Sequence, residues 1–191
     1  MKETKVVAVS DIHGELGFRV NACDILTISG DICPVRGSHH PTRQMFWIEK
    51  FFLPWCKELV SLGVTKDIVF IPGNHDFVFQ RHPLMPMPEH VHMLVDRGVE
   101  VSGVSIYGTP WVPRFGNWAF MLEEPALKDK YASIPLGVDI LLTHGPAFGI
   151  CDMVAGEGEH LGSTALLAAM REKKPQFMLF GHIHTGSHTP Q

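Results

Sequence analysis

Five short apolar runs in this chain share one kind of ending, and that ending constrains the fold more than any other feature. Each run is followed within a few residues by glycine together with histidine, aspartate or asparagine. An uninterrupted apolar run of this length is typical of a strand that is buried on both faces of a sheet. We therefore predict five strands, over residues 5–10, 24–29, 67–71, 139–143 and 176–180.

Apolar residues recur at helical spacing between two pairs of these runs. Residues 41–62 show this spacing, although Pro54 should break or kink a helix there. Residues 163–174 predict a second helix, with Ser163 as its N-cap and Pro175 as its stop.

The rest of the chain completes an alternating order of strands and helices. Residues 101–107 predict another strand, whereas residues 117–131 are ambiguous. Strands that alternate with helices favour a layered α/β fold. Because no linker or repeat interrupts this order, we expect a single domain over residues 1–191.

Composition excludes several functional classes. Hydrophobic residues make up 45% and charged residues 19%, which argues against disorder. Sixteen Lys and Arg against 20 Asp and Glu give a net charge of −4, so a nucleic-acid partner is not expected. No apolar run approaches the roughly 18 residues of a membrane span, so we expect no membrane association.

The four cysteines form no C-x-x-C pair, so a thiolate zinc site is not expected. The first residues lack the pattern of a signal peptide, and we expect reduced thiols in a cytoplasmic protein. Cys23 and Cys56 are expected to be buried apolar residues.

Side chains that can bind metal follow each of the five runs. Loops after parallel strands meet at one edge of a sheet, so these side chains should lie together although they span the chain. Carboxylates, an amide oxygen and imidazoles are ligands for Mn, Fe, Zn or Co. They are too many for one tetrahedral ion, and Asp31, alone in its loop, suits a bridge between two ions. The set is Asp11, His13, Asp31, Asn74, His75, His144, His182 and His184.

Twelve histidines are more than a chain of this length usually has, but position decides their role. A single aspartate or histidine at a strand end is usually a cap, turn or surface residue. Five strand ends that all carry one beside glycine favour a functional site instead. The remaining histidines are interpreted as ordinary surface or core residues: His39, His40, His82, His90, His92, His160 and His188.

The five blocks resemble, in their order, those of the calcineurin-like metallophosphoesterases. They read D-I-H-G, G-D, G-N-H-D, T-H-G and G-H-I-H, beginning at residues 11, 30, 73, 143 and 181. The resemblance implies an α/β fold, a β-sandwich of two mixed sheets flanked by helices in four αββα layers. It also implies a centre of two divalent metal ions at the strand ends, with Mn²⁺ favoured over Fe, Zn or Co.

The resemblance assigns a role to each site residue. One metal ion would be held by Asp11, His13, Asp31 and His184. The second ion would be held by Asp31, Asn74, His144 and His182. His75 would be an acid that contacts the substrate, oriented by Asp76, and a metal-bridging hydroxide would attack phosphorus.

Residues 106–120 are similar to the branch of this family that contains cyclic-nucleotide phosphodiesterases. Trp111, Phe115 and Trp118 are candidates to stack a base, or they belong to the core, and Arg114 is a candidate phosphate contact. The family's protein phosphatases follow G-D with aspartate and arginine, whereas this chain continues with Ile32-Cys33. We therefore expect hydrolysis of small phosphodiesters, cyclic nucleotides among them. The alternatives are a phosphomonoesterase, a nuclease, or a metal-binding interaction module without turnover.

Two further expectations concern the C-terminal half. The chain ends seven residues after His184, where family members usually continue, which indicates a compact or C-terminally shortened fold or a covering subunit. Because an uncovered sheet edge invites pairing, we expect a homodimer. Residues 156–160 are expected to form a mobile loop near the site.

Overall fold

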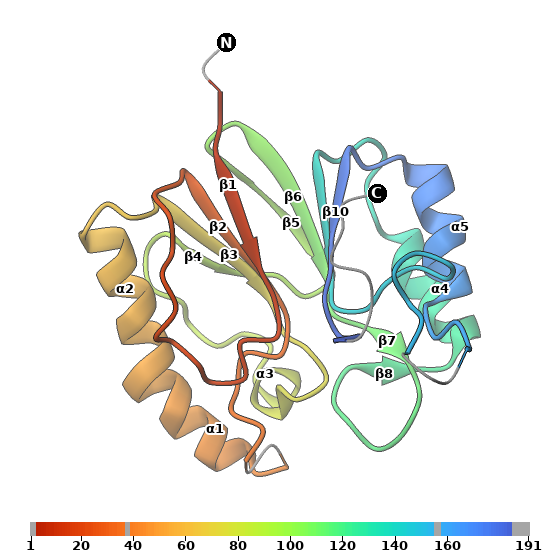
Figure 1. Cartoon of the computed structure of the whole chain (residues 1–191), viewed down its shortest axis with the longest axis horizontal. Helices are drawn as coiled ribbons and strands as arrows, with labels where there is room; N and C mark the ends of the chain where they lie inside the picture. Colours follow the sequence, from red (N-terminus) through yellow and green to blue (C-terminus); the bar gives the residue numbers. More distant parts are fainter. Residues whose placement is uncertain (1–2, 37–38, 155–157, 185–191) are drawn as a thin grey trace.

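Two packed β-sheets with helices on their outer faces make up the computed structural model, which describes residues 3–36, 39–154 and 158–184 (Figure 1). The strands are β1 (Val6–Val9), β2 (Ile25–Ser29), β3 (Asp67–Ile71), β4 (Val91–Met93), β5 (Arg97–Val101), β6 (Val104–Thr109), β7 (Val112–Pro113), β8 (Met121–Leu122), β9 (Ile140–Thr143) and β10 (Phe177–Leu179). The helices are α1 (Pro41–Trp47), the π-helical turn η1 (Ile48–Phe52), α2 (Leu53–Ser61), α3 (Phe77–Arg81), α4 (Glu124–Ala132) and α5 (Thr164–Lys173).

One of the two main sheets is parallel and the other is mixed. The first has the order β1-β2-β3-β4, and all of its pairs are parallel. The second has the order β10-β9-β6-β5, in which only the β5–β6 pair is antiparallel. The expectation of two mixed sheets is thus wrong for the first sheet, where each strand is followed by a crossover that returns the chain in the same direction. A short parallel pair, β7-β8, lies apart from both.

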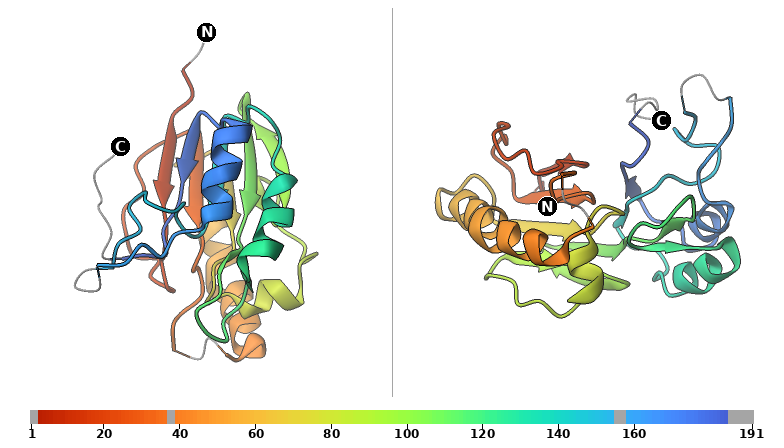
Figure 2. Two further views of the ribbon diagram at one scale, coloured as in Figure 1. Left: turned by 90° about the vertical axis from the view of Figure 1, so that its right-hand side faces the viewer. Right: turned by 90° about the horizontal axis from the view of Figure 1, so that it is seen from below.

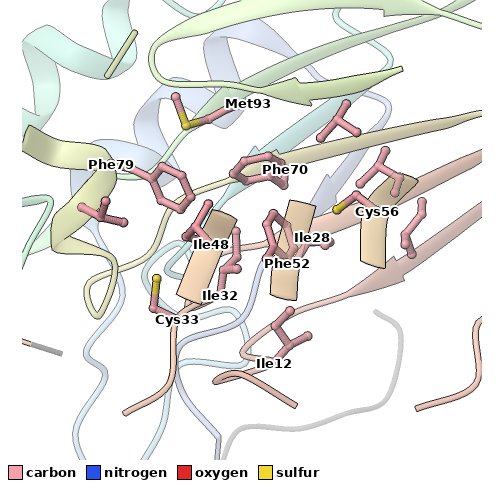
Figure 3. Close-up of a cluster of buried hydrophobic side chains, with 14 of the residues drawn as sticks. Ile12, Ile28, Ile32, Cys33, Ile48, Phe52, Cys56, Phe70, Phe79 and Met93 are labelled. Carbon is pink, nitrogen blue, oxygen red and sulfur yellow. The ribbon is translucent and has the colours of Figure 1, made fainter. Parts of the chain in front are cut away.

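The αββα layers are confirmed by three separate groups of buried side chains. Helices α1 and α2 cover one sheet and helices α4 and α5 cover the other, with the two sheets between them (Figures 1 and 2). Figure 3 shows the first group, in which Ile48 and Phe52 pack on Phe70. The second group fills the space between the sheets, and the third joins α4 and α5 to the second sheet.

Alternation along the strands explains why the apolar runs are uninterrupted. In β3, Ile68 and Phe70 face the helices, whereas Val69 and Ile71 face the other sheet. Successive side chains of a strand point to opposite faces, so a strand covered on both sides needs apolar residues at every position. The five predicted strands are confirmed as β1, β2, β3, β9 and β10.

Of the break or kink predicted at Pro54, the break is wrong. The chain stays helical from Pro41 to Ser61, with Pro54 in the first turn of α2. The preceding turn widens instead into η1, where the N–H of Leu53 donates to the carbonyl of Ile48. Proline lacks an N–H and its ring crowds the carbonyl four residues earlier, and a π-helical turn relieves this conflict without ending the helix.

Several finer expectations are corrected or confirmed. Residues 101–107 do not form one strand, because Ser102 and Gly103 adopt positive φ angles of 50° and 76° and form the turn between β5 and β6. Ser163 caps α5 as predicted, accepting from the N–H of Leu166. Cys23 is half-buried, contrary to expectation, because it lies in the loop before β2.

The ambiguous segment 117–131 contains β8 and most of α4. None of the helices in the described ranges is both long and apolar enough to cross a membrane.

Candidate metal centre

The loops that follow β1, β2, β3, β9 and β10 bring the predicted ligands together at the carboxyl ends of the strands. Nε2 of His144 lies 2.8 Å from Oδ1 of Asn74, although 70 residues separate them in the chain. Nε2 of His184 lies 3.2 Å from Oδ1 of Asp11. The strand-end cluster expected from the sequence is therefore present in the fold, at the carboxyl ends of the strands.

Asp31 is at the centre of this cluster. Its carboxylate lies 3.8 Å from His13 Nε2, 3.8 Å from His75 Nε2 and 3.4 Å from His144 Nε2. It also accepts the backbone N–H of His75 at 2.8 Å. Burial alone would raise the pKa of Asp31, but the neighbouring imidazoles and this hydrogen bond hold it well below its usual range. Asp31 is thus an ionised carboxylate within 4 Å of three imidazole nitrogens, which suits a metal ligand.

Four site residues adopt a left-handed backbone conformation that side chains other than glycine seldom take. The φ angles are 52° at Asp11, 45° at His13, 51° at Asp31 and 74° at His182. Such conformations cost free energy, and they gather at functional sites where the surrounding structure enforces them. The backbone here is therefore arranged to direct these side chains inward.

His144 is held in one orientation by two oxygen partners. Nδ1 lies 2.9 Å from the carbonyl of Ser29, and Nε2 faces Asn74 and Asp31. Burial would lower the pKa of His144, but the Asp31 carboxylate raises it to about 9. A metal-binding histidine usually donates its other ring N–H to a carbonyl or carboxylate. The Ser29 contact meets that requirement and leaves Nε2 as the atom that would bind a metal after losing its proton.

His182 has the opposite electrostatic setting. Its backbone N–H donates to Asp11 Oδ2 at 3.0 Å, and its ring centroid lies 4.8 Å from that of His144. Burial, together with the neighbouring His144, lowers the pKa of His182 to about 3. Its imidazole is therefore neutral and able to bind a metal.

Two glycines allow the carboxylates to lie against the backbone. A Cβ added to Gly73 would overlap Asp31 Oδ1, and one added to Gly181 would overlap Asp11 Oδ2. Both positions therefore require glycine for the close approach of backbone and carboxylate.

The residues present fit divalent metal ions. Ligand atoms of Asp11, His13 and His184 lie within 4.8 Å of one another, as do those of Asp11, Asp31 and His144. Nδ1 of His13 is buried without a hydrogen-bond partner in the part of the chain that the structure describes. Mixed carboxylate and imidazole donors suit divalent transition metals. Asp11 belongs to both groups, whereas the sequence assigned the shared position to Asp31 alone.

His75 lies beside the cluster, but Asp76 does not orient its ring. The Asp76 carboxylate accepts the backbone N–H groups of Ile32, Cys33 and Gly73 at 2.7–3.0 Å. It thereby ties the loop after β2 to the loop after β3, and the predicted contact with the imidazole is corrected to this structural role. Burial and the nearby Asp31 raise the pKa of Asp76 to about 6, against the opposing effect of its three donors.

Gln44 also holds the loop of His75, and the sequence reasoning missed it. Its buried amide donates to the carbonyl of His75 at 2.5 Å and accepts the N–H of Val78 at 2.9 Å. The available signal in the sequence was a polar residue among the helically spaced apolar residues of 41–62.

An open cleft of about 510 Å³ adjoins the cluster. Metal-ligand candidates line it together with apolar, aromatic and basic residues. The lining residues are His13, Asp31, Asn74, His75, Pro113, Arg114, Phe115, Trp118, Val154, Leu161, His182, Ile183 and His184. The volume is typical of small-molecule sites.

Of the three aromatic candidates between β6 and β8, two line the cleft and one does not. Trp118 packs on the ring of His75 with 4.5 Å between centroids, and Phe115 packs on that of His182 at 5.3 Å. Trp111 instead donates its indole N–H to Asp96 and lies below Lys130, outside the lining of the cleft. Its expected contact with substrate is therefore replaced by a structural one.

Arg114 lines the cleft as expected. Its Nε forms an ion pair with Glu123 at 2.8 Å, and its Nη2 donates to the carbonyl of Met121 at 3.3 Å. Its remaining N–H groups can donate hydrogen bonds to an anion in the cleft.

The histidines interpreted as ordinary have structural contacts. His90 and His92 both contact the carboxylate of Asp67, at 3.3 and 3.1 Å. His39 packs against Trp118, which extends the aromatic wall outward. His188 lies outside the described residues.

Asp152 organises the loop that carries Val154 and Leu161 to the cleft. Its buried carboxylate accepts the N–H groups of Gly149 and Gly162 and lies 2.5 Å from Nδ1 of His160. This segment includes the described end of the loop that the sequence placed near the site, residues 158–160; residues 156–157 lie outside the described part.

Replacing Asp152 with asparagine should destabilise the protein in a pH-dependent manner. Burial would raise the pKa of Asp152, but its contacts with His160, Gly149 and Gly162 lower it below the ordinary value. A lowered pKa in the folded state stabilises the protein above the unfolded pKa of about 3.9 and loses that effect as pH falls. The difference in melting temperature between wild type and Asp152→Asn should therefore be largest near pH 7 and shrink below pH 4. A pH-independent difference would contradict this account.

Comparison with known proteins identifies the family of the chain. The sequence matches the family model "Calcineurin-like phosphoesterase" over residues 4–186. Metallophosphoesterase domain-containing protein 1 from Homo sapiens is 32% identical over 201 residues, covering 96% of this chain and 61% of that protein. UPF0046 protein T07D4.2 from Caenorhabditis elegans is 45% identical over 95 residues, 49% of this chain and 24% of that protein. The chain thus spans less than two thirds of either relative.

A solved crystal structure shares the fold, with a TM-score of 0.69 at 15% identity, covering 98% of this chain and 86% of that chain. The family match includes all five loops that build the metal centre. The chain therefore belongs to the calcineurin-like phosphoesterase family.

Proposed function

We propose that this chain is a metal-dependent phosphodiesterase that hydrolyses small phosphodiesters, cyclic nucleotides among them. The observation that carries the proposal is the cleft of about 510 Å³, which Phe115, Trp118 and Arg114 line together with the metal-ligand candidates. Aromatic faces suit a base or another planar ester group, and a guanidinium suits a phosphate. A diester offers both groups at once.

The chain's own residues would bind and orient the ester. Asp11, His13, Asp31, Asn74, His144, His182 and His184 would hold two divalent ions. These ions would supply positive charge for the phosphate oxygens and lower the pKa of an attacking water. Burial lowers the pKa of His75, so its ring enters the reaction neutral, with one N–H to donate to a phosphate or leaving-group oxygen.

We propose Mn²⁺ as the first metal to test, since it accepts oxygen and nitrogen ligands together, with Fe, Zn and Co as the others. The Homo sapiens relative is named as a metallophosphoesterase, which supports metal-dependent chemistry but does not identify the metal. Cytoplasmic location and a homodimer stay predictions; light scattering at micromolar concentration tests the dimer.

The deciding experiment compares esters on metal-free protein given Mn²⁺. Bis-p-nitrophenyl phosphate and p-nitrophenyl phosphate are assayed side by side, followed by 2′,3′- and 3′,5′-cyclic AMP. A higher kcat/KM for the diester supports the proposal, and the two cyclic isomers narrow the substrate class. Preference for the monoester would identify a phosphomonoesterase instead. Two bound ions without turnover of any ester would favour a metal-binding interaction module.

Trp118→Ala should lower kcat on bis-p-nitrophenyl phosphate by about tenfold or less, since an aromatic pair contributes about 0.5–1.5 kcal/mol. The reason is that Trp118 packs on His75, and the N–H of the next residue, Ala119, donates to the carbonyl of Asn74. Trp118→Phe, which keeps a ring against His75, is the matched control and should stay near wild type. Unchanged kcat in both variants, measured at equal metal content, would show that the ring does not position His75.

A further inference from the structure

A second concave surface lies beside α1 and η1, and none of its lining belongs to the metal centre. It encloses about 520 Å³ and is lined by Pro34, Arg36, Thr42, Arg43, Gln44, Phe46, Trp47 and Phe51. We call it the α1 groove. None of these residues is among those that line the catalytic cleft. The helix that forms it lies at the outer side of the first sheet (Figure 1).

Two large aromatic side chains of the α1 groove are left in solvent. Phe46 is 59% and Phe51 is 51% exposed, and their ring centroids lie 6.5 Å apart. On the opposite side of the same helix, Ile48 and Phe52 are fully buried against the sheet. The helix therefore has a second apolar side that the described fold does not cover.

The π-helical turn explains why these two rings meet. Residues five apart in an α-helix point about 140° away from each other, at about 100° a residue. The wider turn of η1, which begins after Phe46 and contains Phe51, reduces this separation and brings the rings to one side. π-helical turns are uncommon and frequently mark functional positions. The exposed pair is thus a consequence of an unusual backbone, and an ordinary α-helix would separate the two rings.

The charged residues in the lining of the α1 groove are both arginines. Arg36 and Arg43 are exposed, and neither has an ion-pair partner within residues 3–36, 39–154 and 158–184. The chain as a whole carries a net charge of −4, so this cationic site runs against the overall balance. Unpaired guanidinium groups beside exposed aromatic rings are typical of protein interfaces, in which arginine and aromatic residues are enriched.

The floor of the α1 groove contacts the loop of the metal centre. Gln44 lines the groove, and its side chain donates to the carbonyl of His75. An occupant of the groove would therefore lie against a residue that holds the backbone of the site.

We propose that the α1 groove binds a partner protein through an acidic segment that carries an aromatic or aliphatic anchor side chain. The anchor would bury against Phe46, Phe51 and Trp47. Aspartate or glutamate side chains beside it would pair with Arg36 and Arg43, which can bind carboxylates through two parallel hydrogen bonds. The charge of the lining selects an acidic partner over a basic or neutral one.

The test is a selection from a random 12-residue peptide library on the purified full chain. Enriched peptides are then synthesised with a fluorophore and measured by anisotropy at low and high salt. We expect sequences with an aromatic or leucine residue flanked by aspartate or glutamate, and binding that weakens as salt increases. Enrichment of basic or uncharged peptides, or no enrichment, would overturn the proposal.

Two variants locate the binding surface. Phe51→Ser and Arg43→Glu should each weaken the selected peptide by at least about tenfold, equal to about 1.4 kcal/mol. The matched controls are Phe177→Ser, which removes a ring that is 64% exposed on β10, and Lys57→Glu, which makes the same charge change on α2. Both controls should bind as wild type does. Equal loss in the controls would contradict the assignment to the α1 groove.

Evidence for either of two other occupants of the α1 groove would also overturn the proposal of an acidic partner. Burial of the groove by a second copy would appear as a concentration-dependent dimer that Phe51→Ser dissociates. Binding to anionic phospholipid vesicles, abolished by Arg43→Glu while no peptide is enriched, would identify a lipid surface instead. Thermal melts confirm that each variant is folded, and bis-p-nitrophenyl phosphate hydrolysis reports on the catalytic cleft independently.

Discussion

Asp31→Asn will remove bound metal and lower kcat/KM on bis-p-nitrophenyl phosphate by more than about 100-fold. Substituting a residue that only hydrogen-bonds to a metal ligand typically costs about 10–100-fold, and the loss here should be larger. The carboxylate of Asp31 lies within 4 Å of three imidazoles, and asparagine keeps its shape while losing its charge and one of its two acceptor oxygens. If Asp31 binds both ions, as the resemblance implies, a neutral amide at this position should lose one of them. The measurements are metal content by mass spectrometry and initial rates with added Mn²⁺.

Asp67→Asn is the control for this change. Asp67 is also an aspartate in contact with two histidines, His90 and His92, but it lies at the start of β3, away from the strand ends that form the centre. It should leave metal content and turnover unchanged. Retention of two ions and of more than half the activity in Asp31→Asn would show that Asp31 does not bridge.

The convergence of the metal-ligand candidates was predictable because two regularities coincide in the sequence. Apolar runs without alternation identify strands that are covered on both faces, and parallel strands bring their carboxyl ends to one edge. Asp11, Asp31 and His144 each follow such a run directly or within two residues, so their convergence follows from the topology. The same logic placed His182 and His184 after β10.

The departures have local causes that hydrophobic patterning does not capture. Pro54 predicted a break or a kink, and the preceding residues form a π-helical turn that lets the helix continue. Ser102 and Gly103 lie within an apolar stretch, yet their positive φ angles make a tight turn there. The first sheet is parallel because each connection between its strands returns the chain to the same end of the sheet. The apolar runs alone do not specify the direction of these connections.

Side-chain partners were the least predictable part of the site. Trp111, Phe115 and Trp118 are aromatic residues of one short segment, and the sequence does not distinguish their roles. Only the fold shows that Trp111 contacts Asp96 and Lys130 while the other two line the cleft. The contact of Asp76 was misassigned for the same reason, since sequence adjacency to His75 suggested a bond to its ring. In the structure its three donors come from two loops that are about forty residues apart, which no local pattern reveals.

Asp76→Ala should lower the free energy of unfolding by about 3–5 kcal/mol, because three buried N–H groups lose their acceptor and each unsatisfied donor costs about 1–3 kcal/mol. The carboxylate is fully buried, so water cannot replace it without reorganising the loops. Those loops carry Asp31 and Asn74, and metal content should fall together with stability. The measurement is urea unfolding of metal-free protein at pH 7, followed by metal titration of the folded variant.

Asp76→Asn separates the structural role from a catalytic one. Asparagine keeps one acceptor oxygen, so it should retain part of the unfolding free energy that alanine loses. If Asp76 acted by orienting the His75 imidazole, Asp76→Asn would reduce kcat while leaving stability and metal content unchanged. If it joins the two loops, stability and metal affinity should fall together and kcat per bound metal pair should stay close to wild type. The three N–H donors at 2.7–3.0 Å lead us to expect the second result.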